Sequence, residues 1–196
     1  SQGGGGSIPD TGFAGLSKRF DLVKPIIAAV NGFAMGGGLE ICLACDFRVM
    51  STAAKIGLPE TKLGILPGWG GTVRLPRIIG VDEAVMWIAT AQDQSADAAL
   101  KAGAVDAIAA PEQLREVALA TLANATAGKL DYQHRRQAKS GPLPLNDTEA
   151  MMAFFTIKSM VAQQAGKNYP APVKVVDVIE AARGATVVIL SDGWDR

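Results

Sequence analysis

The feature that most constrains the fold is a short apolar run followed by glycines. Residues 26–30 read Ile-Ile-Ala-Ala-Val between a proline and an Asn-Gly pair, which is typical of a strand buried on both faces of a sheet. Three glycines at 36–38 then lead into an apolar, helix-like stretch at 39–45, and residues 46–50 have the pattern of a second strand. This order of strand, glycine turn, helix and strand predicts a βαβ unit of an α/β protein.

Composition and spacing divide the whole chain into four segments. Residues 1–23 combine a Gly-rich stretch, expected to be flexible, with a short amphipathic helix over 13–23. Residues 24–110 form the predicted α/β core, 111–183 a C-terminal helical region and 184–196 a strand-like tail. Caps and breakers predict an extended piece at 55–57, a turn or helix start at 59–61, a glycine-rich loop at 64–71 that opens a helix, helices over 82–90, 95–102, 111–125, 145–165 and 173–183, and strands over 105–108 and 185–190.

The charge balance excludes several classes of partner. The chain has 19 Lys and Arg against 19 Asp and Glu and a pI near 6.6, whereas a nucleic-acid-binding surface needs a clustered basic excess. The longest apolar runs fall far short of the roughly 20 residues that span a bilayer. No secretion signal opens the sequence, so we expect no membrane partner and a cytoplasmic location.

Histidine and cysteine are too scarce for imidazole or metal chemistry. The single histidine, His134, lies in a polar stretch and is expected to be exposed and uninvolved. Cys42 and Cys45 are three residues apart in an apolar run, so a disulfide framework is not expected, and no second pair completes a zinc site. An enzyme of this composition must rely on carboxylates and backbone amides.

Two glutamates beside glycine-rich turns are the candidate catalytic groups. Glu40 follows the glycines at 36–38, and Glu60 precedes the Leu-Pro-Gly-Trp-Gly-Gly loop at 66–71. Free N–H groups at a helix start can bind a carbonyl oxygen that becomes negative, and paired carboxylates can divide the roles of base and acid. The alternative is structural: glycines at such junctions often serve packing alone. The pattern lacks the fingerprints of dinucleotide and phosphate loops, which disfavours nicotinamide and nucleoside-triphosphate enzymes.

Three sequence blocks resemble the crotonase (enoyl-CoA hydratase/isomerase) superfamily. They are KPIIAAVNGFAMGGGLE at 24–40, ACDFR at 44–48 and KIGLPETKLGILPGWGGTVRLPR at 55–77. The segments at 130–137 and 160–172 extend the likeness to the hydratase domains of bacterial multifunctional fatty-acid oxidation proteins. The resemblance implies a crotonase-like (ClpP/crotonase) fold, with a core of repeated ββα units in a spiral and a helical C-terminal region.

The resemblance also implies a reaction and its residues. Glu40 and Glu60 match the glutamates that hold the water added across the C2–C3 double bond of an enoyl-CoA thioester, Glu40 as the base and Glu60 as the proton donor to C2. Gly37 matches an N–H donor to the thioester oxygen, and Gly68 a loop position that helps hold the water. The same carboxylates fit a shift of a Δ3 double bond to Δ2. An acyl-CoA substrate and no metal or redox cofactor are implied, in a trimer-type homo-oligomer or as a subunit of a fatty-acid oxidation complex.

Two departures from the family pattern leave alternatives open. The loop that supplies the family's other oxyanion donor, of the type Ala-Gly-Ala-Asp, is absent, and residues 185–196 look like the strand that normally leads into it. We therefore expect a core that is incomplete or rearranged on its N-terminal side, with an ordinary terminal strand as the alternative. A non-catalytic or trans-completed acyl-CoA-binding module and another crotonase reaction, such as dehydration of a hydroxyacyl- or carnitinyl-CoA, remain candidate functions. Leu66 and Trp69 are candidates for the wall of an acyl pocket.

Overall fold

A parallel three-stranded sheet forms one layer of the core. The computed structural model describes residues 10–19, 21–166 and 169–184. Its first sheet has the order β1 (Ile27–Val30), β3 (Phe47–Ser51) and β6 (Ala107–Ala109), with all pairs parallel. The predicted strand, helix and strand are confirmed. The prediction that β1 is buried on both faces is wrong, because Ala29 is exposed although Val30 is buried.

A second sheet contains a strand that the sequence did not reveal. β2 (Phe33–Met35) pairs in parallel with β4 (Lys55–Gly57), which pairs antiparallel with β5 (Gln94–Ser95). β1, β2 and α1 (Gly37–Ala44) form one ββα unit, and β3, β4 and α2 (Gly71–Ile79) form the next. Each unit gives one strand to each sheet before its helix. This repeated ββα arrangement confirms the predicted crotonase-like architecture.

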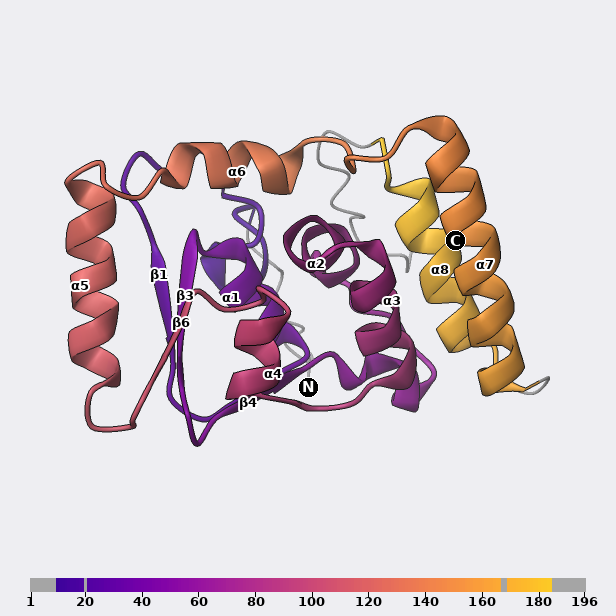
Figure 1. Ribbon diagram of the computed structural model, residues 1–196, viewed down its shortest axis with the longest axis horizontal. Coiled ribbons are helices and arrows are strands. Elements are labelled where there is room, and N and C mark those ends of the chain that lie inside the picture. The colour runs from indigo at the N-terminus through magenta and orange to yellow at the C-terminus, as the bar shows by residue number, and fades with distance from the viewer. Residues whose placement is uncertain (1–9, 20, 167–168, 185–196) are drawn as a thin grey trace, which may run out of the picture.

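Helices cover the sheets on several sides (Figure 1). α5 packs on β1 and β3, α1 packs on α2, and α3 packs on α2 and α8. In Figure 1, α6 crosses the top of the molecule and the pair of α7 and α8 lies at the right. The remaining elements are η1 (Phe13–Gly15), η2 (Pro59–Leu63), α3 (Val81–Thr90), α4 (Ala96–Lys101), α5 (Leu114–Thr126), α6 (Tyr132–Ser140), α7 (Asp147–Ala165) and α8 (Ala171–Ala181).

The predicted helix over 13–23 is wrong in extent. Only the 3-10 turn η1 forms there, and no further helix follows in the described part of that segment. Gly12 and Gly15 have φ of 82° and 67°, and Ala14 has φ of 52°. These left-handed conformations interrupt a right-handed helix after a few residues. The predicted strand at 185–190 lies outside the described residues.

The basic stretch that begins at Tyr132 is a helix, which its polar composition did not suggest. Asp131 caps α6 by accepting a hydrogen bond from the amide of His134 at 2.9 Å. Arg136 makes two 2.7 Å hydrogen bonds to the buried carboxylate of Asp46, and Lys139 donates to the carbonyls at the C-terminus of α1. Tertiary ion pairs therefore hold this helix on the core.

Of the two C-terminal helices, α7 forms close to its predicted bounds, whereas α8 begins and ends two residues earlier than predicted. Asn146 and Glu149 form a reciprocal capping box at the start of α7, at 2.9 Å in both directions. Phe154 and Val161 on α7 and Val175 on α8 are buried in the main apolar core. The other side of α7 exposes Met151, Met152, Phe155 and Met160.

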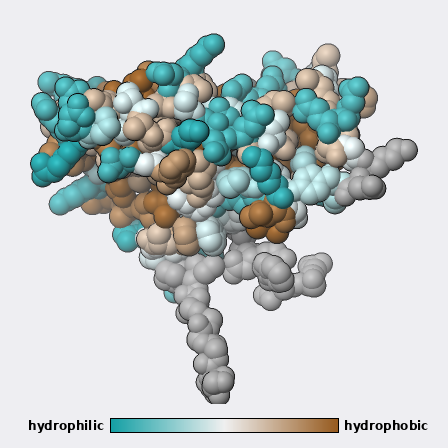
Figure 2. All heavy atoms as spheres, turned by 90° about the horizontal axis from the view of Figure 1, so that it is seen from below, coloured by the Kyte–Doolittle hydropathy of each residue, from teal (hydrophilic) through white to brown (hydrophobic). Residues whose placement is uncertain are grey.

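Figure 2 shows the face seen from below, where hydrophobic patches lie among hydrophilic side chains. No described helix has the length and apolar character that crossing a membrane requires.

Candidate active site

Glu40 is buried at the start of α1 and is held by two loop amides. Its side-chain Oε1 accepts hydrogen bonds from the N–H of Trp69 at 2.8 Å and of Gly71 at 2.7 Å. The residue is only 1% exposed. Its second oxygen, Oε2, is buried without a hydrogen-bond partner in the described structure. Hydrogen bonds to one oxygen thus fix the carboxyl group in place.

Glycines in the 66–71 loop allow this close approach. Gly70 has φ of 102°, a conformation that other residues rarely adopt, and it precedes the first residue of α2. A Cβ atom at Gly71 would lie 3.0 Å from Oε1 of Glu40 and 3.0 Å from Cβ of Pro67. A side chain at Gly71 would therefore push against the carboxylate that its amide binds.

Glu60 approaches the same region from the neighbouring strand of the same sheet, because α1 follows β2 and η2 follows β4. It lies in η2, directly after β4, and its Oε2 is also buried without a hydrogen-bond partner among the described residues. A Cβ atom at Gly36 would lie 3.1 Å from Oε1 of Glu60. Gly36 adopts φ of 54° and donates a 2.9 Å hydrogen bond to the carbonyl of Gly57, while its own carbonyl accepts from the Glu40 amide at 3.0 Å. Gly36 therefore connects the backbones that carry the two glutamates.

Burial shifts the pKa of both carboxyl groups upward. Removal from water, with a smaller contribution from the negative charge of Glu60, raises the pKa of Glu40 to about 7 against the opposing effects of the two loop amides and Arg74. Burial also raises the pKa of Glu60. Carboxyls that titrate closer to neutrality than usual can exchange protons with a substrate near neutral pH.

Gly37 lies where an oxyanion donor is expected, under an aromatic stack. It is the first residue of α1, and no hydrogen bond from its amide is found within the described chain. A Cβ atom on it would lie 2.5 Å from Cζ3 of Trp69, whose ring stacks on Phe13 with centroids 3.6 Å apart. Glycine is therefore required for the ring to pack here. Its role as a donor stays a prediction.

The loop residues named from the sequence have separate positions. Gly68 is exposed, and a Cβ atom on it would meet nothing within 4 Å, so its role in holding water stays a prediction. Leu66 packs against the apolar core, whereas half-buried Trp69 lies beside Gly37. Of the two, only Trp69 lies at the site.

Several contributors were missed because their roles depend on backbone geometry. The amides of Trp69 and Gly71 bind Glu40, and the buried guanidinium of Arg74 donates to the Trp69 carbonyl at 3.0 Å and to the Ser17 carbonyl. The Trp-Gly-Gly sequence was a usable signal for a tight loop but did not specify which amides would point at Glu40.

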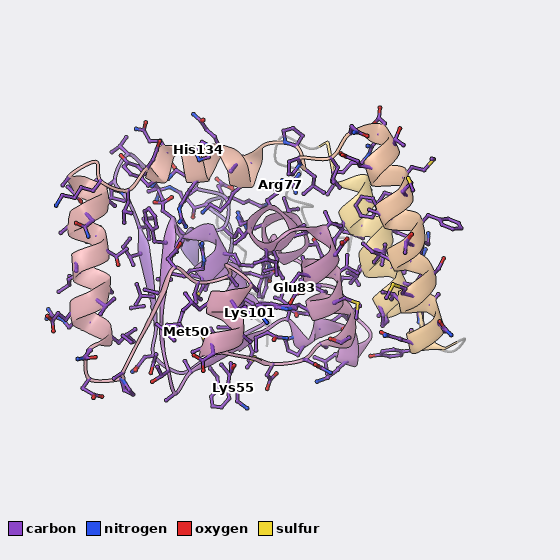
Figure 3. All side chains as sticks on the ribbon, viewed as in Figure 1. Met50, Lys55, Arg77, Glu83, Lys101 and His134 are labelled. Atoms are coloured by element: carbon purple, nitrogen blue, oxygen red, sulfur yellow. The ribbon has the colours of Figure 1, made fainter. Side chains whose placement is uncertain are left out.

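Groups that suit a metal ion are not gathered at this site. In the described ranges no set of three His, Cys, Asp or Glu residues is placed to hold one. His134 is exposed on α6, as Figure 3 shows at the top of the molecule. The arrangement offers instead two carboxyl groups beside a helix N-terminus, and carboxyl groups can in general transfer protons.

The repeated ββα units, with a buried and a half-buried glutamate beside them, are those of a crotonase-type protein. The family model described as enoyl-CoA hydratase/isomerase matches residues 6–165, and the chain belongs to that family. It is 60% identical over 162 residues to the fatty acid oxidation complex subunit alpha of Pseudomonas paraeruginosa, a match that covers 83% of this chain. The same match covers 23% of the relative, so the chain spans about a quarter of that protein.

Solved structures of similar proteins support the fold. An enoyl-CoA hydratase from Bacillus anthracis superposes with a TM-score of 0.54 at 31% identity, covering 86% of this chain and 56% of that one. A carnitinyl-CoA dehydratase from Mycobacterium avium gives a TM-score of 0.59 at 30% identity, covering 85% and 62%. The α/β core and the C-terminal helices thus follow an established family architecture.

Proposed function

We propose that this chain is a 2-enoyl-CoA hydratase of fatty-acid β-oxidation, which adds water to the C2–C3 double bond of an acyl-CoA thioester. One observation carries the proposal: Glu40 and Glu60 each keep one carboxyl oxygen buried and without a partner in the described structure, and the charge of one raises the pKa of the other. Buried polar atoms in proteins are nearly always hydrogen-bonded, so two unpaired carboxyl oxygens in one region fit a site built to hold water.

In the proposed reaction the two carboxyl groups act in opposite directions. Ionised Glu40 takes a proton from the water as the oxygen of the water forms a bond to C3. Protonated Glu60 gives its proton to C2, and the electron pair of the double bond forms the new C2–H bond. Addition occurs on one face of the double bond. Transfer of a proton from Glu40 back to Glu60 then restores the starting state for the next turnover.

The N-terminus of α1 would stabilise the charge that develops on the substrate. As water adds at C3, negative charge moves to the thioester oxygen, and the Gly37 amide is the proposed donor to it. Loss of one such donor typically costs about 10²–10³ in rate. Gly68 and the exposed start of the loop are proposed to border the bound water.

Hydration of crotonyl-CoA, followed by loss of the enoyl-thioester absorbance, tests the proposal. We expect turnover by the parent protein and a loss of about 10²–10⁴-fold in Glu40→Gln and in Glu60→Gln. Glu112→Gln is the matched control, because Glu112 is exposed before α5 and should keep parental activity. A Glu40→Gln protein as active as the parent would refute the mechanism.

Three alternatives use the same residues. The TM-score of 0.59 to a carnitinyl-CoA dehydratase favours testing dehydration of hydroxyacyl and carnitinyl thioesters. A shift of a Δ3 double bond to Δ2 needs only the proton transfers that Glu40 and Glu60 provide. Acyl-CoA binding without turnover by any of these substrates would instead indicate a binding module, or one completed by another chain.

We further propose that the reaction needs no metal or redox cofactor. Proton transfer by two carboxyl groups is sufficient for it, and activity in the presence of a strong chelator is the expected outcome.

A cytoplasmic location agrees with the free thiols of Cys42 and Cys45. Assembly as a subunit of a fatty-acid oxidation complex is proposed from the name of the 60% identical relative. Assembly as a trimer-type homo-oligomer is proposed from the family resemblance alone, and sedimentation of the purified chain tests it.

A further inference from the structure

Glu60 depends on its backbone for its position. The carboxyl of Glu40 is tied to two amides, but in the described structure Oε2 of Glu60 has no hydrogen-bond partner. The backbone that carries it, η2, has five residues and ends at Gly64 with φ of 76°. Short 3-10 segments have poor hydrogen-bond geometry and little stability of their own. Contacts from other elements must therefore hold η2.

Two hydroxyl groups hold the residue next to Glu60. Thr61 is 1% exposed, and its Oγ1 donates a 2.7 Å hydrogen bond to the carbonyl of Ile88 in α3. The phenol of Tyr169 donates to the carbonyl of Thr61 from the segment that joins α7 to α8. The same Thr61 carbonyl closes the turn by accepting from the amide of Gly64 at 3.0 Å. Thr61 is thus fixed from two sides by elements distant in sequence.

Tyr169 makes this contact beside a cavity rather than inside tight packing. The cavity has a volume of about 300 Å³ and lies between η2, α3 and the ends of α7 and α8. Tyr169 is 37% exposed, and Pro170 and Pro172 restrict the backbone that follows it. Because the ring is only partly packed, its hydroxyl group is the specific part of the contact.

We infer that Tyr169 is a positioning residue for Glu60, which acts through the Thr61 carbonyl to set the carboxyl group that gives a proton to C2. The inference rests on the proposed hydratase function for its kinetic consequence. Its structural consequence is independent of turnover: without the phenol hydroxyl, η2 loses one of the two hydrogen bonds that tie Thr61 to other elements and keeps the bond from Thr61 to Ile88. Displacement of a reacting group by a fraction of an ångström is enough to slow a reaction by about tenfold.

The test compares the two tyrosines of the chain. Tyr169→Phe removes the hydroxyl and keeps the ring, and we expect kcat to fall about tenfold with KM within about twofold of the parent. Tyr132→Phe is the matched control, because the Tyr132 hydroxyl also donates to a backbone carbonyl, that of Val23 at 2.9 Å, but from α6. Both variants lose one hydroxyl-to-carbonyl bond, so similar losses of stability are expected.

Two readouts separate positioning from a general effect on folding. In Tyr169→Phe the limb of the kcat pH profile that reports Glu60 should move, and in Tyr132→Phe it should not. A titration of the Glu60 carboxyl carbon by NMR should show the same contrast without any substrate. Parental kcat and an unmoved Glu60 titration in Tyr169→Phe would overturn the inference. A parent protein that does not hydrate crotonyl-CoA would refute the proposed function, and the NMR contrast would still decide the inference.

Discussion

The two glutamates of the site are held by different means. Glu40 is 1% exposed, lies on a regular helix and is bound directly through its carboxyl group by the amides of Trp69 and Gly71. Glu60 lies on a five-residue 3-10 segment that is fixed through the Thr61 carbonyl and hydroxyl. The first carboxyl is therefore held by direct hydrogen bonds, and the second depends on contacts that α3 and the segment before α8 make with its backbone.

This difference suits the roles proposed for the two groups. A base needs a constant position, which the two amides that point at Glu40 supply, and these amides also offset part of the cost of burying its charge. An acid needs to hold a proton, and burial raises the pKa of Glu60 because its ionised form is poorly solvated there. Because burial raises the pKa of both groups, the difference between Glu40 and Glu60 can be measured by varying the pH.

The largest expected effect is on stability as a function of pH. Burial raises the pKa of Glu40 from 4.5 to about 7, so between these values the folded protein keeps a proton that the unfolded chain has lost. The free energy of unfolding should therefore fall by on the order of 3 kcal/mol as pH rises from about 4.5 to above 7. Urea unfolding at several pH values measures it.

Glu40→Gln should remove most of this decline, since glutamine does not titrate. Glu60→Gln should remove a smaller part, because burial raises the pKa of Glu60 as well but that group is only half-buried. Equal pH dependence in the parent and in Glu40→Gln would contradict the assignment of the shift to Glu40.

Next in size is the effect of a side chain at Gly71. In Gly71→Ala the new Cβ would lie 3.0 Å from both the Glu40 carboxylate and Pro67, and the carboxylate must move. We expect kcat/KM for crotonyl-CoA to fall about 100-fold. Gly32→Ala is the control, because a Cβ atom there meets nothing within 4 Å. A parental rate in Gly71→Ala would show that Glu40 does not need this exact placement.

Gly36→Ala should disturb the Glu60 side instead. Gly36 has φ of 54°, and a Cβ atom there would lie 3.1 Å from Oε1 of Glu60. The strained backbone should cost about 2 kcal/mol of unfolding free energy, as measured by urea denaturation. The pH limb of kcat assigned to Glu60 should shift more than the limb assigned to Glu40. A larger shift of the limb assigned to Glu40 would contradict the prediction that Gly36 acts mainly on Glu60.

The smallest expected effect lies away from both carboxyls. Asn146→Ala removes the cap of α7 and should lower the unfolding free energy by about 1 kcal/mol. Because Asn146 lies at the opposite end of α7 from the segment that carries Tyr169, the pH profile of kcat should keep its parental midpoints. A moved profile would mean that the whole helix, rather than the Tyr169 hydroxyl alone, sets Glu60.

Much of the fold was predictable because it rests on local patterns. β1, β3, α1, α2, α3, α4, α7 and α8 arise from apolar spacing, glycine stops and caps such as Ser95 and Asn146, and they form within a few residues of their expected ends. The helix over 13–23 failed because positive φ at Ala14 and its neighbours interrupts it. β2 and α6 were missed because pairing with β4 and ion pairs with Asp46 stabilise them.

The sequence by itself determined the chemistry available to this chain: one histidine, paired glutamates beside glycine turns, and motifs of a family that works with carboxyls and amides. Only the tertiary structure decided how these groups are held, because the amides of Trp69 and Gly71, the Thr61 carbonyl and the Tyr169 hydroxyl are common groups in any sequence. Their function comes from direction and distance, and both are set by long-range packing across 29 to 108 residues of chain.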